Sequence, residues 1–174
     1  MTNKELFKII KALKKNEMEG FDQLYYATKD IVYYTILAIM KDPSLSEDIM
    51  QDTYLTMLEK IHSFKQNTSV KSWLTTIARN KSLNEYKKRK RELQVDMSEQ
   101  EGLFGQTESS SEKELIVREI LQKLNETERD IVVYKVLGDL TFKEISKILD
   151  IPQGTVSWKY QESIKKLKNT YESR

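Results

Sequence analysis

The sequence contains no cysteine, a single histidine, 5 Gly and 2 Pro in 174 residues. Without cysteine it can form neither a disulfide framework nor a thiolate zinc site, and His62 alone cannot build a histidine metal site. We therefore expect no metal and no other cofactor. No run approaches the roughly 18 apolar residues of a membrane span, and the N-terminal segment lacks the apolar core of a signal peptide. We expect a cytoplasmic protein without direct membrane insertion.

Glycine and proline, which commonly mark the turns between strands, are scarce, whereas helical periodicity runs through most of the chain. The pattern predicts an all-α fold of two small helical domains joined by a flexible linker, the second domain being a helix-turn-helix. In the first domain, residues 1–92, we expect a short amphipathic helix through residues 6–13, a longer one through 21–39, a third over 47–61 capped by Ser46, and a fourth over 70–91.

Charge divides the chain in the same way. Lys and Arg exceed Asp and Glu by five in residues 1–92, Asp and Glu exceed Lys and Arg by five in residues 93–114, and residues 115–174 carry a net charge of +2. Periodicity also vanishes after Glu92, where Ser, Gly and acidic residues dominate. This composition is typical of a flexible linker, which we assign to residues 93–113.

Residues 114–174 predict the second domain, with helices over 114–124 and 125–137 followed by two short helices around a tight turn, Leu149-Asp150-Ile151. Thr141 and Glu144 form a T-x-x-E capping box, so the first helix of this pair should begin at Phe142. The second should begin near Pro152. It has one apolar stripe, made of Val156, Tyr160, Ile164 and Leu167. A helix-turn-helix is the geometry that inserts a helix into a DNA groove.

The expected helix over residues 70–91 is strongly basic, with seven Lys or Arg and a single Glu85 between Arg79 and Arg91. Such density favours a polyanion, although cations at a helix end also complement the helix dipole. One face of this helix combines amides that can read base edges with cations that can hold phosphate: Asn80, Asn84, Lys87 and Arg91. Trp73 could stack on an unpaired base, or could belong to the core.

A third pattern is acidic. Asp48, Gln51, Asp52 and Leu55 share one face of the preceding helix. Carboxylates in a first helical turn can simply complement the dipole, but this face could also dock a basic helix. The carboxylates have no His or Cys companion that would suggest catalysis, and the chain has no glycine-rich phosphate loop. We expect the protein not to be an enzyme.

Taken in order, the three patterns resemble the extracytoplasmic-function (ECF) group of the sigma-70 family of RNA polymerase sigma factors. The resemblance implies a factor that binds core RNA polymerase at its clamp and flap regions and directs promoter recognition, DNA melting and transcription initiation at a specialised promoter set. It divides the chain into sigma region two (1–92), the linker, and sigma region four (114–174). It also implies an anti-sigma factor as a candidate partner beside promoter DNA.

The resemblance assigns roles to individual residues. The clamp-binding face is Asp48, Gln51, Asp52 and Leu55. The contacts to the minus-ten promoter element are Lys65, Lys71, Trp73, Arg79, Asn80, Asn84, Lys87, Lys88 and Arg91, with the loop from Lys65 to Lys71 and Asn80 capturing a flipped base. The contacts to the minus-thirty-five element are Gln153, Thr155, Ser157, Trp158, Lys159 and Glu162.

The sequence departs from the family where Ser157-Trp158-Lys159 and Glu162 replace mostly basic residues of the recognition helix. Fewer phosphate anchors suggest weaker or differently specified upstream binding, with Trp158 facing a thymine methyl. Two other functions stay open from the residues alone. A helix-turn-helix repressor or activator would need a dimer to read two half-sites. A nuclease could use Asp48 and Asp52 as metal ligands and would need a divalent metal.

Overall fold

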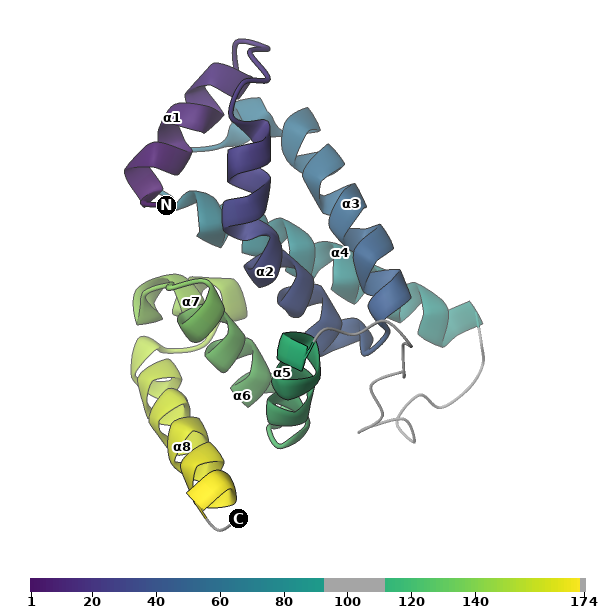
Figure 1. Cartoon of the computed structure of the whole chain (residues 1–174), viewed down its shortest axis with the longest axis vertical. Helices are drawn as coiled ribbons and strands as arrows, with labels where there is room; N and C mark the ends of the chain where they lie inside the picture. The colour runs from purple at the N-terminus through teal and green to yellow at the C-terminus, as the bar shows by residue number, and fades with distance from the viewer. Residues whose placement is uncertain (93–111, 173–174) are drawn as a thin grey trace.

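The computed structural model describes residues 1–92 and 112–172. Most of these residues are helical and none of them forms a strand, which confirms the all-α prediction. The first bundle consists of α1 (Asn3–Leu13), α2 (Phe21–Met40), α3 (Pro43–Glu59), the short 3-10 turn η1 (Ile61–Ser63) and α4 (Val70–Glu92). The second consists of α5 (Glu112–Gln122), α6 (Glu126–Val132), the π-helical turn η3 (Val133–Leu137), α7 (Phe142–Leu149) and α8 (Gln153–Glu172). Figure 1 shows the second bundle lying against α2, with α8 projecting away from the first bundle.

Several helices begin where local capping chemistry requires. Thr141 accepts a hydrogen bond from the Glu144 amide at 3.2 Å, and Glu144 accepts one from the Thr141 amide at 2.8 Å. Asn125 and Glu128 form the same reciprocal box at the start of α6. After α7, Asp150 adopts the left-handed conformation, with φ of 53°, and ends the helix. These contacts confirm the predicted start of α7 at Phe142 and the tight turn after Leu149.

The predicted start of the third helix is wrong. α3 begins one turn earlier, at Pro43, because the Asp42 carboxylate accepts a hydrogen bond from the Leu45 amide at 3.0 Å. Proline is compatible with the first helical position, where its missing N–H has no partner to lose. Ser46 is buried inside the helix, and its hydroxyl donates to the Asp42 carbonyl at 2.6 Å. At the other end α3 stops at Glu59, so that Ile61 belongs to η1.

Two further helices differ from the prediction, one in its start and one in the geometry of its last turn. α5 begins at Glu112, slightly before the expected start at residue 114, whereas residues 93–111 of the expected linker lie outside the described residues. The helix expected over 125–137 widens in its last turn, because the Gly138 amide donates to the Val133 carbonyl at 3.3 Å, an i to i+5 bond. Gly138 follows the last residue of η3, which confirms the predicted stop.

The first bundle has its own hydrophobic core. It is formed by apolar side chains from α1 to α4 and η1, with fully buried examples in Ile10, Leu24, Ile36, Met57 and Leu74. Phe64 and Val70 close the core beside the loop between η1 and α4. This core holds α3 and α4 side by side, so the acidic and basic patterns lie on neighbouring helices of one bundle.

The second core is shared by the two bundles. Ile31, Tyr34 and Leu37 of α2 are buried among the apolar side chains of the second bundle, including Ile131 and Tyr134. The neighbouring positions of α2, such as Val32 and Ile36, face the first core. α2 is therefore apolar on two faces and joins the bundles, a contact that the periodicity of α2 did not predict.

Candidate polymerase and nucleic-acid interfaces

The acidic face of α3 is exposed to solvent. Asp48, Gln51, Asp52 and Leu55 all lie on the outer side of the helix, while Ile49, Tyr54 and Met57 point into the core. Leu55 is the notable member, because a large apolar side chain that is 59% exposed lies between polar neighbours. An apolar residue rimmed by acidic and amide groups suits a protein partner with a basic surface.

The expected basic face of α4 is also exposed. Asn80, Asn84, Lys87, Lys88 and Arg91 lie on the solvent side, whereas Leu74, Ala78 and Ser82 are buried on the other side. Most of the cations at the end of α4 are available to an anion. Arg89 is engaged with Glu85 at 3.2 Å within the helix. The face can therefore follow a phosphate backbone with its cations, while the amides lie nearer the start of the helix.

Trp73 and the preceding loop have different environments. Lys65 is exposed, and Lys71 is partly exposed at the start of α4. The Trp73 ring packs on Phe64, with ring centroids 5.0 Å apart and planes tilted by 54°, and it borders the first core. The loop is anchored from the other side, since the Asn3 side chain accepts a hydrogen bond from the Val70 amide at 3.0 Å. Trp73 thus contributes to packing while it remains partly exposed.

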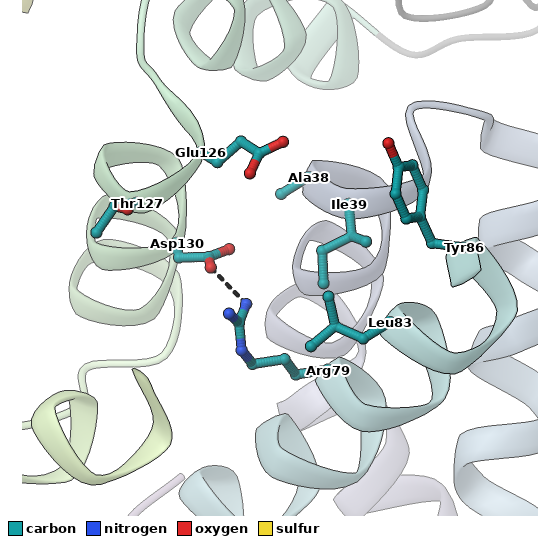
Figure 2. A pocket seen from close by; sticks show the side chains of 8 residues that line it. All are labelled: Ala38, Ile39, Arg79, Leu83, Tyr86, Glu126, Thr127 and Asp130. Carbon is teal, nitrogen blue, oxygen red and sulfur yellow. Dashed lines mark hydrogen bonds and ion pairs between the residues drawn. The ribbon is translucent and has the colours of Figure 1, made fainter. Parts of the chain in front are cut away.

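Arg79 is held by the second bundle. Its guanidinium donates to the Asp130 carboxylate of α6 at 2.5 Å, and only 21% of the Arg79 side chain and 8% of the Asp130 side chain are exposed (Figure 2). Burial raises the pKa of Asp130 to about 6, although the charge of Arg79 acts to lower it. Burial also disfavours the charged form of Arg79, but Asp130 and Tyr134 together outweigh this effect and raise the Arg79 pKa above its usual value. The cost of desolvating the Asp130 carboxylate is thus larger than its attraction to Arg79.

A second contact joins the loop before α4 to the second bundle. Burial acts to raise the pKa of Glu144, but hydrogen bonds from Ser69 and Thr141 outweigh it and lower that pKa. Ser69, Lys71 and Glu144 line one cavity of about 270 Å³ between α1, the loop and α7. Neither Asp130 nor a role for Glu144 beyond capping is predicted from the sequence. The sequence does place Asp130 directly before the apolar run Ile131-Val132-Val133, so its carboxylate is expected next to buried side chains.

The recognition helix α8 presents the expected residues. Gln153, Trp158 and Glu162 are exposed, with Trp158 60% exposed, while Thr155, Ser157 and Lys159 are partly exposed. The predicted apolar stripe is buried at Val156 and only partly buried at Tyr160, Ile164 and Leu167. Ser163 is buried with them because its hydroxyl donates to the Lys159 carbonyl at 2.7 Å, which satisfies the polar group within the helix.

Within residues 1–92 and 112–172, no three His, Cys, Asp or Glu side chains gather in a way that could hold a metal ion. Over the same ranges, no helix combines the length and apolar character needed to cross a membrane.

Comparison with known proteins identifies both bundles. The Sigma-70 region 2 family matches residues 24–92, and the Sigma-70, region 4 family matches residues 120–169. Among curated relatives, the ECF RNA polymerase sigma factors SigM and SigW of Bacillus subtilis are each 28% identical to this chain. The SigM match covers 85% of this chain and 94% of SigM, and the SigW match covers 86% and 87%.

Two solved structures share the fold. One is the sigma factor RpoE in complex with the anti-sigma factor NepR from Bartonella quintana, with a TM-score of 0.68, 20% identity, and coverage of 88% of this chain and 98% of that chain. The other is CnrH in complex with the cytosolic domain of CnrY, with a TM-score of 0.65, 16% identity, and coverage of 95% and 96%. With regions two and four matched in order and ECF relatives aligned over most of its length, the chain belongs to the ECF group of sigma-70 factors, which bind core RNA polymerase and direct promoter recognition for transcription initiation.

Proposed function

We propose that the chain performs this role through three surfaces on three separate helices. The exposed face of α3, made of Asp48, Gln51, Asp52 and Leu55, binds the polymerase clamp, and the second bundle approaches the flap region. The observation that carries this assignment is the exposed Leu55 among acidic and amide side chains. A helix-turn-helix repressor that reads two half-sites as a dimer does not need this exposed face for its DNA contacts.

The minus-ten contact is assigned to the loop between η1 and α4 and to α4 itself. Lys65, Lys71 and Asn80 hold a flipped base beside Trp73, and the exposed cations of α4 hold the backbone of the opened strand. The residues that contact phosphate or base edges along α4 are Arg79, Asn84, Lys87, Lys88 and Arg91. Trapping of the unpaired base melts the DNA without any bond being made or broken by the protein, so the chain performs no catalysis of its own.

The minus-thirty-five contact is assigned to α8, through Gln153, Thr155, Ser157, Trp158, Lys159 and Glu162. The exposed Trp158 stands where a direct contact to a thymine methyl is feasible, and it supplies apolar contact in place of phosphate anchoring. The factor acts in the cytoplasm, with residues 1–92 as region two, 93–113 as linker and 114–174 as region four. Both similar solved structures are complexes with a second protein, and one of them pairs a sigma factor with an anti-sigma factor, so an anti-sigma factor is also a candidate partner.

The test of the clamp assignment is the double substitution Asp48→Lys with Asp52→Lys in the full chain. We expect loss of binding to core RNA polymerase in native gels and loss of run-off transcription, because like charges would then face the basic partner surface. The matched control is Glu17→Lys with Glu19→Lys, which makes the same charge change at exposed positions of the same bundle. Normal polymerase binding by the α3 variant would overturn the assignment. Run-off transcription on a randomised promoter library then shows which sequences are preferred at both promoter elements.

A further inference from the structure

An exposed stripe of lysines runs along α1, outside the three surfaces described above. Its members are spaced at i, i+4, i+7 and i+11, and all are exposed to solvent: Lys4, Lys8, Lys11 and Lys15. The first three belong to α1, and Lys15 lies in the turn that follows it. The other side of the helix is buried through Leu6, Ile10 and Leu13. At the helical rise of about 1.5 Å per residue, the stripe is about 16 Å long.

The positive charge of this stripe is not neutralised by the protein. Like charges three or four residues apart on one helix repel each other. The one acidic residue of α1 is Glu5, and its carboxylate is engaged at the helix cap, where it accepts a hydrogen bond from the Thr2 amide at 2.6 Å. Within residues 1–92 and 112–172, none of the four lysines forms an ion pair. A bound anion would therefore relieve the repulsion along the stripe.

α1 is fastened to both ends of the loop between η1 and α4. The Asn3 side chain accepts a hydrogen bond from the Val70 amide at 3.0 Å, and Lys14 donates to the Phe64 carbonyl at 3.0 Å. Between these contacts, the Phe7 ring packs on Phe64 with centroids 5.9 Å apart. Asn3, Phe7 and Lys14 each directly precede a lysine of the stripe. The stripe therefore runs beside the row of contacts that holds the loop.

Ring contacts connect the stripe to the basic face of α4. The Lys11 ammonium lies 5.0 Å from the centre of the Phe7 ring, which packs on Phe64. Phe64 in turn packs on Trp73, with centroids 5.0 Å apart. Trp73 precedes Asn80 by seven residues, so both lie on the same face of α4. One surface thus runs from α4 across the loop to α1, which lies at the outer edge of the first bundle and points in a different direction from α4 (Figure 1).

We propose that the lysine stripe of α1 binds the phosphates of the opened promoter strand where that strand leaves the loop. The proposal rests on the proposed function, because it takes the loop as the place where an unpaired base is held. The exposed cations of α4 hold the strand on one side of that base, and the stripe holds it on the other. A single strand suits this surface, because a stiff duplex could not follow the change of direction from α4 to α1. Contacts to phosphate add affinity and position the strand without reading its sequence.

The test uses full chains bound to core RNA polymerase. One variant replaces the four lysines of the stripe by glutamine, and a second replaces them by arginine, which keeps the charge. The matched control removes four exposed lysines without an assigned contact: Lys60→Gln, Lys123→Gln, Lys165→Gln and Lys168→Gln. The probes are two fork DNAs built on a promoter that the natural factor selects from the randomised library. In the short probe the opened strand ends with the minus-ten element, and in the long probe it continues towards the transcription start site.

On the long probe, the slope of log affinity against log salt should be smaller by about 3 for the glutamine variant, because each phosphate neutralised on a single strand contributes about 0.7. A rise in salt from about 50 to 200 mM should therefore weaken binding of the natural factor about 50-fold more than binding of this variant. On the short probe the two should agree. The arginine variant and the control should match the natural factor on both probes, and circular dichroism shows whether every variant keeps its helices.

The outcomes separate this inference from the proposed function. Equal slopes for the glutamine variant and the natural factor on the long probe would refute the stripe, while the clamp and minus-ten assignments would stand on their own assays. An equal loss on both probes would place the stripe at the minus-ten element itself and would overturn the inference. Weaker binding of the glutamine variant to core polymerase without DNA would assign the stripe to the polymerase instead. If Lys87→Gln with Lys88→Gln left binding of the short probe unchanged, the minus-ten assignment would fail, and the inference with it.

Discussion

Gly138 provides a sharp test of the packing between the bundles. Its φ of −86° is open to any residue, so the requirement for glycine is one of space. A Cβ at this position would lie 2.6 Å from the Tyr134 carbonyl oxygen and 3.1 Å from both the Ile31 Cδ1 and Leu140 Cγ atoms. The carbonyl cannot simply move away, because it accepts a hydrogen bond from the Leu140 amide at 3.1 Å. Gly138→Ala therefore forces a shift of backbone as well as of side chains.

The magnitude follows from these contacts. Overpacking typically costs about 1–3 kcal/mol, and a clash with backbone belongs at the upper end. Alanine returns about 0.4–1 kcal/mol by restricting the unfolded chain. The net loss of about 2 kcal/mol in the free energy of unfolding should lower the melting temperature by about 4–8 °C for a chain of this length.

The assay is thermal unfolding followed by circular dichroism, with Gly154→Ala as the matched control. Gly154 lies in the first turn of α8, and a Cβ there would meet nothing within 4 Å. Gly154→Ala should stabilise the chain by about 0.4–1 kcal/mol through the unfolded state alone. A melting temperature for Gly138→Ala equal to or above that of the natural chain, or an equal shift in both variants, would refute the reasoning.

Three further outcomes are expected. Leu74→Ala, in the centre of the first core, should cost about 2–5 kcal/mol by urea unfolding, whereas Thr76→Ala on the exposed side of α4 should cost much less; similar losses would contradict the assigned core. Trp158→Ala should leave polymerase binding intact and change the preferred upstream bases by about 1–3 kcal/mol, read from a randomised promoter library; an unchanged preference would remove Trp158 from the DNA contact. Because burial raises the Asp130 pKa from 3.8 to about 6, the stability that this group gives the folded chain is complete below the ordinary pKa and lost as pH rises through about 6. The free energy of unfolding should therefore be larger at pH 5 than at pH 7 by an amount that Asp130→Asn removes; an unchanged pH dependence in that variant would assign the effect elsewhere. The groups around Asp130 are Arg79 from α4 and Glu126, Arg129 and Tyr134 from the second bundle.

Local chemistry was sufficient to predict most helix boundaries and the exposed faces of the helices. The box of Thr141 and Glu144 defines the start of α7 because both partners lie within one turn. The face of Asp48 and Leu55 follows from helical spacing alone. The prediction for α3 failed because Asp42 and Ser46 are both acceptable N-caps. Pro43, which suits the first helical turn, favoured Asp42, and Ser46 found its partner inside the helix.

The sequence by itself determined the helices, their capping, the order of the acidic, basic and helix-turn-helix patterns, and hence the family. Only the tertiary structure decided which core each apolar residue of α2 enters and what Arg79 contacts. Periodicity marks Ile31 and Leu37 as buried without stating against which partner. Arg79 and Asp130 are separated by 51 residues, and nothing local to either one selects the other. Their pairing depends on how two bundles pack, and that depends on the summed burial of many side chains from both.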